Sequence, residues 1–142
     1  MFGRSQAVLF LLGCVAISGR AHADDAGAAP QGETVSASAT CDKVMGPGRV
    51  RCSAELRAGA GETLRWADLQ IVETPPFVSA LKGRVGPADA TREPAKWRFS
   101  FGLVARARGS ADVTLRVRAV VCRGEVCRPE VVPVVTRVAV GD

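Results

Sequence analysis

Apolar and polar residues alternate along much of the chain from residue 35 onward, which is the pattern of β-strands that bury one face. The pattern is clearest in residues 113–121, where valine, leucine and alanine alternate with threonine and arginine. Residues 96–108 repeat it, and the large apolar side chains that share one side there are Trp97, Phe99, Phe101 and Leu103. We expect these side chains, and Trp66 earlier in the chain, to pack in a hydrophobic core.

Turns rich in glycine and proline separate the other expected strands. The expected ranges are residues 35–44, 49–58, 62–73, 77–85, 96–108, 113–121 and a valine-rich run that ends at residue 140. The alternation breaks near Ala67 and Asp68, which indicates a bulge or a corner. Residues 86–95 are expected to form a loop and residues 109–112 a turn. About seven strands and no helical periodicity predict an all-β fold, an immunoglobulin-like antiparallel β-sandwich.

The last two strands are joined by the segment CRGEVC at residues 122–127, in which Gly124 suits a tight turn. A hairpin closed here places Cys122 and Cys127 opposite or nearly opposite each other. Cross-strand Cβ atoms lie about 4.5–5.5 Å apart and a disulfide needs about 3.5–4.5 Å, so the bond can form. Pro129 and Pro133 lack a backbone N–H, which favours an edge position for the final strand.

Three segments of different composition divide the chain. Residues 1–23 begin with Arg4, continue through an apolar run and end in the small-residue triplet AHA, which predicts a secretory signal peptide cleaved after Ala23. Residues 24–34 are small and polar and are expected to form a flexible leader. Residues 35–142 are expected to form a single β-sandwich domain, long enough to bury a sizeable core.

The signal peptide predicts an exported, periplasmic protein. The tetrapeptide LLGC at residues 11–14 resembles a bacterial lipoprotein box, so a lipoprotein anchored at Cys14 is the alternative. The apolar run itself is too short to span a bilayer, which takes about 20 residues. We therefore expect contact with a membrane only if Cys14 is lipidated.

Charge and residue composition exclude several classes of function. The chain has 19 lysines and arginines against 14 aspartates and glutamates, and the basic residues are scattered singly along the expected strands. This indicates solvated strand faces, for example at Arg116 and Arg118, rather than a nucleic-acid surface. The single histidine, His22, lies in the signal peptide, so the mature chain has none for catalysis or metal binding. We expect no cofactor and no metal.

The mature chain holds four cysteines, Cys41, Cys52, Cys122 and Cys127, which allow three pairings. The local pairing joins Cys41 to Cys52 and Cys122 to Cys127, each within its own expected hairpin, and we favour it. The alternative joins Cys52 to Cys122 across the sheets, with Trp66 between them as in antibody domains. A zinc site of all four cysteines is disfavoured, because the C-x10-C spacing of the first two is too wide for a zinc knuckle.

Residues 115–134, LRVRAVVCRGEVCRPEVVPV, resemble the carboxy-terminal hairpin of the amino-terminal periplasmic domain of DsbD-type thiol:disulfide interchange proteins. The segment ETPPF at residues 73–77 is similar to a proline-rich segment of the same family. The resemblance implies an immunoglobulin-like fold and a redox-active pair, Cys122 and Cys127. It also implies electron exchange with a membrane electron carrier or a thioredoxin-like periplasmic protein.

Two functions from different classes remain. The first is thiol–disulfide exchange through Cys122 and Cys127, which needs no histidine and in which Arg123 and Arg128 would favour the thiolate. The protein would then be a component of a thiol–disulfide oxidoreductase system. The second is a non-enzymatic β-sandwich domain that binds a protein partner and uses both disulfides for stability. The Cys41–Cys52 pair is expected to be structural in either case.

Overall fold

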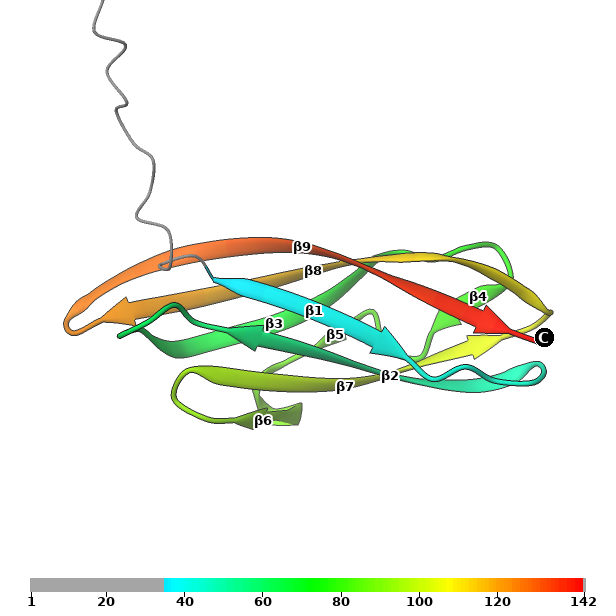
Figure 1. Ribbon diagram of the computed structural model, residues 1–142, viewed down its shortest axis with the longest axis horizontal. Helices are drawn as coiled ribbons and strands as arrows, with labels where there is room; N and C mark the ends of the chain where they lie inside the picture. The colour runs from blue at the N-terminus through cyan, green and yellow to red at the C-terminus, as the bar shows by residue number, and fades with distance from the viewer. Residues whose placement is uncertain (1–34, 142) are drawn as a thin grey trace, which may run out of the picture.

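The alternating segments form two antiparallel β-sheets, which the computed structural model describes over residues 35–141. The expected signal peptide, with Cys14, and the expected leader lie outside the described residues. The first sheet contains β1 (Ser36–Cys41), β2 (Gly48–Arg57), β7 (Lys96–Ala105) and β4 (Val78–Ala80) in that order, with β6 (Ala90–Arg92) also paired to β7. The second contains β5 (Arg84–Val85), β3 (Thr63–Glu73), β8 (Gly109–Arg123) and β9 (Val126–Val140). Figure 1 shows the long strands running along an elongated molecule.

The strand order is that of an immunoglobulin-like sandwich, in which one sheet follows the order ABED and the other contains CFG. Here β1, β2, β7 and β4 correspond to A, B, E and D, and β3, β8 and β9 to C, F and G. The sheets also meet at one edge, where Val44 N–H donates to the Ala139 carbonyl at 3.2 Å and Gly141 N–H donates to the Val44 carbonyl at 2.8 Å. The expected fold class is confirmed.

The hydrophobic core fills the space between the sheets and comes mainly from the inward faces of β2, β7 and β8. All four large apolar side chains expected to share one side of β7 are buried. They face the inward valines, leucine and alanine of β8, which also alternate as expected. Burying one such side chain stabilises a fold by about 1.5–3 kcal/mol, so these two strands anchor the sandwich.

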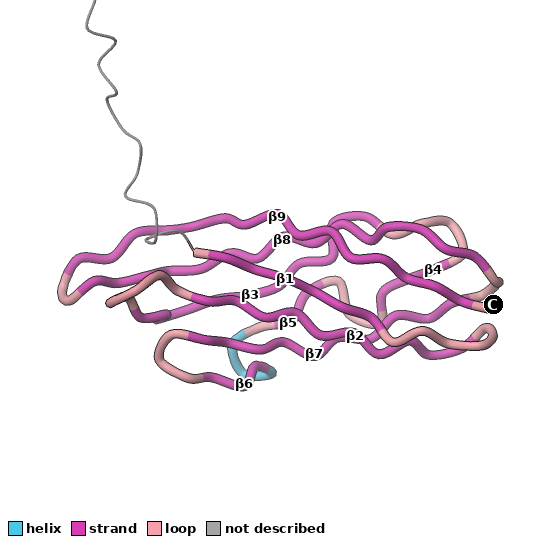
Figure 2. The backbone as a smooth tube through the Cα atoms, viewed as in Figure 1, coloured by secondary structure: helices cyan, strands magenta, loops and turns pink. Residues whose placement is uncertain are grey.

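The structure has nine strands rather than about seven, and the difference arises between β3 and β7. The single strand expected over residues 77–85 is divided, because β4 pairs with β7 in the first sheet and β5 pairs with β3 in the second. The loop expected over residues 86–95 contains β6 and a short 3-10 turn, η1 (Pro87–Asp89), the helical segment in Figure 2. The turn expected at residues 109–112 belongs to β8, and the chain reverses at residues 106–108 instead.

Trp66 does not lie in the core, so that expectation is wrong. A bulge between Leu64 and Trp66 adds Arg65 to β3 without a partner on β8. One extra residue reverses the faces that follow it. Leu64 and Ala67 therefore point into the core, whereas Trp66 lies half-buried on the outer face of the second sheet. The bulge expected near Ala67 and Asp68 lies a few residues earlier.

Candidate functional site

The two disulfides lie in different sheets, one on the inward face of the first sheet and the other outside the core on the second sheet. Cys41 is bonded to Cys52 and Cys122 to Cys127, which is the local pairing rather than the cross-sheet alternative. The Cys41–Cys52 pair joins β1 to β2 on the inward face, where both residues pack in or against the core. The Cys122–Cys127 pair joins β8 to β9 beside the hairpin turn and lies outside the core cluster.

The two halves of the hairpin disulfide differ in exposure. Cys122 is only 1% exposed, whereas Cys127 is exposed. The turn next to them is the two residues Gly124 and Glu125, with Gly124 at a φ of 58°, a conformation that glycine adopts without strain. An attacking thiolate would therefore reach the sulfur of Cys127, and Cys122 would leave as the buried thiolate.

The arginines beside this disulfide are matched by carboxylates. Arg128 forms a two-pronged contact with Glu62, at 2.5 Å and 3.1 Å, and its Nε donates to Glu130 at 2.7 Å. Arg123 lies 3.8 Å from the Glu62 carboxylate and donates to the Ala60 carbonyl at 3.2 Å. The hydrogen bonds from Arg128 hold the pKa of Glu62 below its usual value although burial opposes this. The positive charge expected to favour a thiolate is thus largely used to hold the β2–β3 loop against the hairpin.

Beyond the disulfide, β9 presents an apolar column on the outer face of the second sheet. Alternate residues of the strand point outward, and after Cys127 the first four are Pro129, Val131, Pro133 and Val135, followed by the charged Arg137. We call these four residues the β9 column. Val131 and Val135 are 59% and 60% exposed. Exposed valines are ordinary when they occur singly, but a continuous column along one strand is typical of an interaction surface.

The prolines of the β9 column change the free edge of the strand without weakening its pairing. The Cα atoms of Cys122 and Cys127 are 4.0 Å apart, which identifies a non-hydrogen-bonded pair, because such pairs lie about 4.5 Å apart and hydrogen-bonded pairs about 5.5 Å. Pair types alternate along the ladder, so Pro129 and Pro133 also occupy non-hydrogen-bonded positions opposite β8. A backbone N–H at these positions would point away from β8, toward the edge.

Both prolines therefore remove donors from the edge of β9 that faces away from β8, near β1, and leave the β8–β9 ladder intact. In the part of the chain that the structure describes, β9 pairs only with β8 and, through Val140, with Val44. The expected edge position of this strand is confirmed. Proline on an edge strand hinders the addition of another strand, so the outward face of β9 is better suited to binding than its edge.

A buried acid organises the centre of the same face. Asp68 on β3 is fully buried and accepts hydrogen bonds from Arg118 at 2.9 Å and 2.6 Å, while the Nε of Arg84 lies 2.5 Å from the same carboxylate. The guanidinium of Arg118 also stands 5.6 Å from the ring centre of Trp66. Burial raises the pKa of Asp68, but the hydrogen bonds and charges of the two arginines outweigh it, and the pKa lies below its usual value. The sequence predicts a solvated strand face for Arg118, but its guanidinium contacts Asp68 and Trp66.

Sequence reasoning missed Asp68 and Glu62, the two buried acids. One signal was present for Asp68, an acidic residue between the apolar residues Ala67 and Leu69, whereas Glu62 follows a turn of glycine and alanine and gives none. Among residues 35–141, no group of three or more histidines, cysteines or acids could hold a metal ion. Within the same residues, no helix is long and apolar enough to cross a membrane.

Comparison with known proteins gives distant structural likenesses. No family model matches the sequence, and no curated protein matches it. A PapD-like domain of human CEP192 is similar over 98% of this chain and 100% of its own length, with 11% identity and a TM-score of 0.39. A structure from the AAF fimbriae of enteroaggregative Escherichia coli, reported with fibronectin binding and biofilm formation, is similar over 75% of this chain and 99% of its own, with 10% identity and a TM-score of 0.36. MyfA, the major subunit of Myf fimbriae from Yersinia enterocolitica, matches 75% of this chain and 98% of its own at 12% identity and a TM-score of 0.32.

Proposed function

We propose that this chain is a non-enzymatic β-sandwich domain of an exported protein, which binds a protein partner through the outer face of its second sheet. The observation that carries the proposal is the β9 column, an exposed apolar surface on a strand whose edge is blocked by proline. In this function both disulfides are structural. The Cys41–Cys52 bond holds the core side of the first sheet, and the Cys122–Cys127 bond fixes the hairpin that presents the column.

The charges around the β9 column indicate the kind of partner. Residues 35–141 contain 17 lysines and arginines and 10 aspartates and glutamates, so this part of the chain is basic. Arg116 lies opposite Pro133 and donates to the neutral amide of Gln70 at 3.0 Å, so its charge can pair with an acid from outside. An apolar partner surface with acidic groups at its rim would match both features.

Glutamate at Val131 and Val135 is expected to abolish partner binding. Burying a valine contributes about 1.5–3 kcal/mol, so each substitution should weaken binding at least about tenfold. To measure this, a photo-crosslinking residue replaces Pro133 in the chain as its own host exports it. The crosslinked product with the partner should be lost when the chain also carries Val131→Glu and Val135→Glu.

Val72→Glu is the matched control, because Val72 is 53% exposed on β3 of the same sheet but outside the β9 column. It should leave the crosslinked product unchanged, and added salt should reduce the product if the partner is acidic. Equal loss in the control variant would contradict the proposal. A product made of two copies of this chain would also contradict it.

Thiol–disulfide exchange is the second candidate, supported by the exposure of Cys127 outside the core. In this function a partner thiolate attacks the sulfur of Cys127, a mixed disulfide forms, and Cys122 leaves as the thiolate. A second thiolate of the partner then breaks the mixed disulfide, which leaves this chain reduced and the partner oxidised. The paired state of Arg123 and Arg128 gives this candidate less support than the sequence did.

The Cys122–Cys127 bond is expected to be reduced before the Cys41–Cys52 bond, because Cys127 is exposed and the other pair packs with the core. Titration against defined thiol buffers with mass-tagging of freed cysteines measures the order and the potential. A potential above about −270 mV for Cys122–Cys127 would favour exchange, and one below about −300 mV a structural bond. Earlier reduction of Cys41–Cys52 would contradict the placement of the two bonds.

A further inference from the structure

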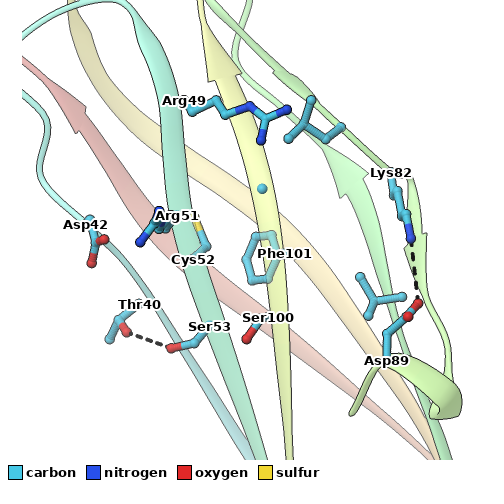
Figure 3. Close-up of a pocket in the computed structure, with 13 residues that line it drawn as sticks. Thr40, Asp42, Arg49, Arg51, Cys52, Ser53, Lys82, Asp89, Ser100 and Phe101 are labelled. Carbon is cyan, nitrogen blue, oxygen red and sulfur yellow. Dashed lines mark hydrogen bonds and ion pairs between the residues drawn. The ribbon is translucent and has the colours of Figure 1, made fainter.

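A second surface feature, independent of the β9 column, lies beside β7 of the first sheet, where residues of the outer face and of the core both line it. It is an open pocket of about 560 Å³ at the edge of β7. Strand β4 pairs with residues 103–105 of β7 and β6 pairs with residues 97–99, so residues 100–102 have no strand beside them on that side. The chain crosses to the second sheet between β4 and β6, and this crossing leaves the gap. Figure 3 shows Ser100 and Phe101 at its centre.

A glycine shapes the floor of the pocket. A Cβ atom at Gly102 would lie 2.6 Å from Cδ1 of Leu81, so a side chain there would push the end of Leu81 away from the strand. Leu81, Val85 and Phe101 then give the pocket an apolar lining. That lining can accept a short apolar group.

Backbone groups of β7 also point into the gap. Leu81 N–H donates to the Gly102 carbonyl at 3.0 Å, which shows that the polar groups of Gly102 face this side. Backbone groups of alternate residues in a strand point the same way, so the N–H and carbonyl of Ser100 face the pocket as well. No strand among the described residues pairs with Ser100 there. Ala90 and Phe99 form a non-hydrogen-bonded pair, so the Ser100 N–H is directed at the Asp89 carbonyl that flanks β6.

Cations stand on both sides of these backbone groups. Arg49 and Arg51 come from the outward face of β2, both are exposed, and within residues 35–141 neither forms an ion pair. Lys82 lies across the pocket, 3.7 Å from Asp89 with both side chains exposed, a pairing that contributes little. In Figure 3 the guanidinium of Arg49 extends over β7 while Lys82 stands on the far side.

The charges of the lining sum to one positive charge. The cations are Arg49, Arg51 and Lys82, and the acids are Asp42 and Asp89. Asp42 stands on the side of Arg51 away from β7 in Figure 3, so it lines the rim of the pocket rather than its centre. A single negative charge therefore completes the site. The hydroxyls of Thr40, Ser53 and Ser100 line the same wall and can donate to its oxygens.

We propose that this pocket binds a small organic carboxylate that carries a short apolar group. The carboxylate lies between the arginines of β2 and Lys82, within reach of the Ser100 hydroxyl. The apolar group packs against Leu81 and Phe101. The planar guanidinium fork matches the two oxygens of a carboxylate, which makes arginine well suited to this role.

Hexanoate is a suitable probe, with hexanamide as its neutral counterpart, in a titration of the exported chain followed by amide NMR shifts. We expect saturable shifts at Leu81, Ser100 and Gly102 with hexanoate, and at least tenfold weaker binding of hexanamide, because a charge-assisted contact is lost. Acetate and inorganic phosphate, which lack the apolar group, should bind more weakly than hexanoate. Equal binding of hexanamide, or phosphate binding as tight as hexanoate, would overturn the proposal.

Substitutions of the lining residues test whether hexanoate binds in this pocket. Arg51→Met and Arg49→Met should each weaken hexanoate binding about tenfold or more, and Leu81→Ala should lower it to the level of acetate. Arg65→Met is the matched control, because Arg65 is an exposed arginine on the other sheet. The assignment is wrong if the Arg49 and Arg51 variants bind hexanoate as tightly as the unmodified chain, or if the Arg65 variant is weakened equally. Shifts in amide signals elsewhere in the sandwich would also contradict it.

Discussion

Replacing Cys41 and Cys52 by alanine is expected to lower the free energy of unfolding by roughly 2–5 kcal/mol, the usual cost of losing a disulfide in a small exported domain. Two features of the structure place the loss in this range. The bond closes a loop with a sequence separation of 11. Cys52 is also buried in the core cluster, so alanine leaves unfilled space beside its neighbours. Urea unfolding of the oxidised protein and the variant measures the difference.

The same replacement at Cys122 and Cys127 is the matched comparison and should cost less. Its sequence separation is 5, for which the chain-entropy relation gives roughly 2 kcal/mol, against roughly 3 kcal/mol for a separation of 11. The pair also lies outside the core, so its removal opens no space there. A larger loss at Cys122 and Cys127 than at Cys41 and Cys52 would show that the hairpin, rather than the first sheet, limits the stability of the domain.

The disulfide pairing and the main strands could be predicted because their determinants are local in the sequence. The alternation in residues 113–121 and 96–108 identifies one buried face without knowledge of any partner strand. Cys122 and Cys127 flank one turn, so their proximity follows from the hairpin itself. The short strands β5 and β6 span two and three residues, too few to show any period, and only their pairing with β3 and β7 defines them.

The surfaces of the sandwich were harder to predict, because they depend on register between distant segments. The outward position of Trp66 follows from one extra residue at Arg65, which the composition of the strand does not indicate. The pocket on the first sheet exists because β4 and β6 stop short of each other along β7 and because Gly102 has no side chain. Neither feature has a sequence pattern of its own.

The burial of Asp68 depends on register in the same way, and its removal is the second large expected effect. Asp68→Asn is expected to lower the free energy of unfolding by roughly 1–3 kcal/mol at neutral pH, the range for losing hydrogen bonds to a charged group. The loss stays below that for stranding a buried charge, about 3–5 kcal/mol, because Arg118 and Arg84 are 38% and 54% exposed and water can solvate them. Urea unfolding at a series of pH values measures it.

The pH dependence identifies the cause. The folded-state pKa of Asp68 lies below its ordinary value of 3.8, so the unfolded state takes up the proton first as pH falls. The stability that the carboxylate contributes is therefore complete above about pH 5 and disappears as pH falls through the folded-state pKa. The difference between wild type and Asp68→Asn should follow the same course and become small in strong acid, where the native side chain is also neutral.

Asp112→Asn is the control for this titration, because Asp112 is also an aspartate paired with an arginine on the second sheet. Its contact with Arg137 is 3.4 Å long and both side chains are more than half exposed, so an effect near zero is expected at every pH. A deficit in Asp68→Asn that persists unchanged below pH 3 would mean that shape and packing at this position matter, and not the ionised carboxylate. In that case Arg118 and Arg84 would be held on the outer face by contacts other than those to the Asp68 carboxylate, such as the contact of the Arg118 guanidinium with the Trp66 ring.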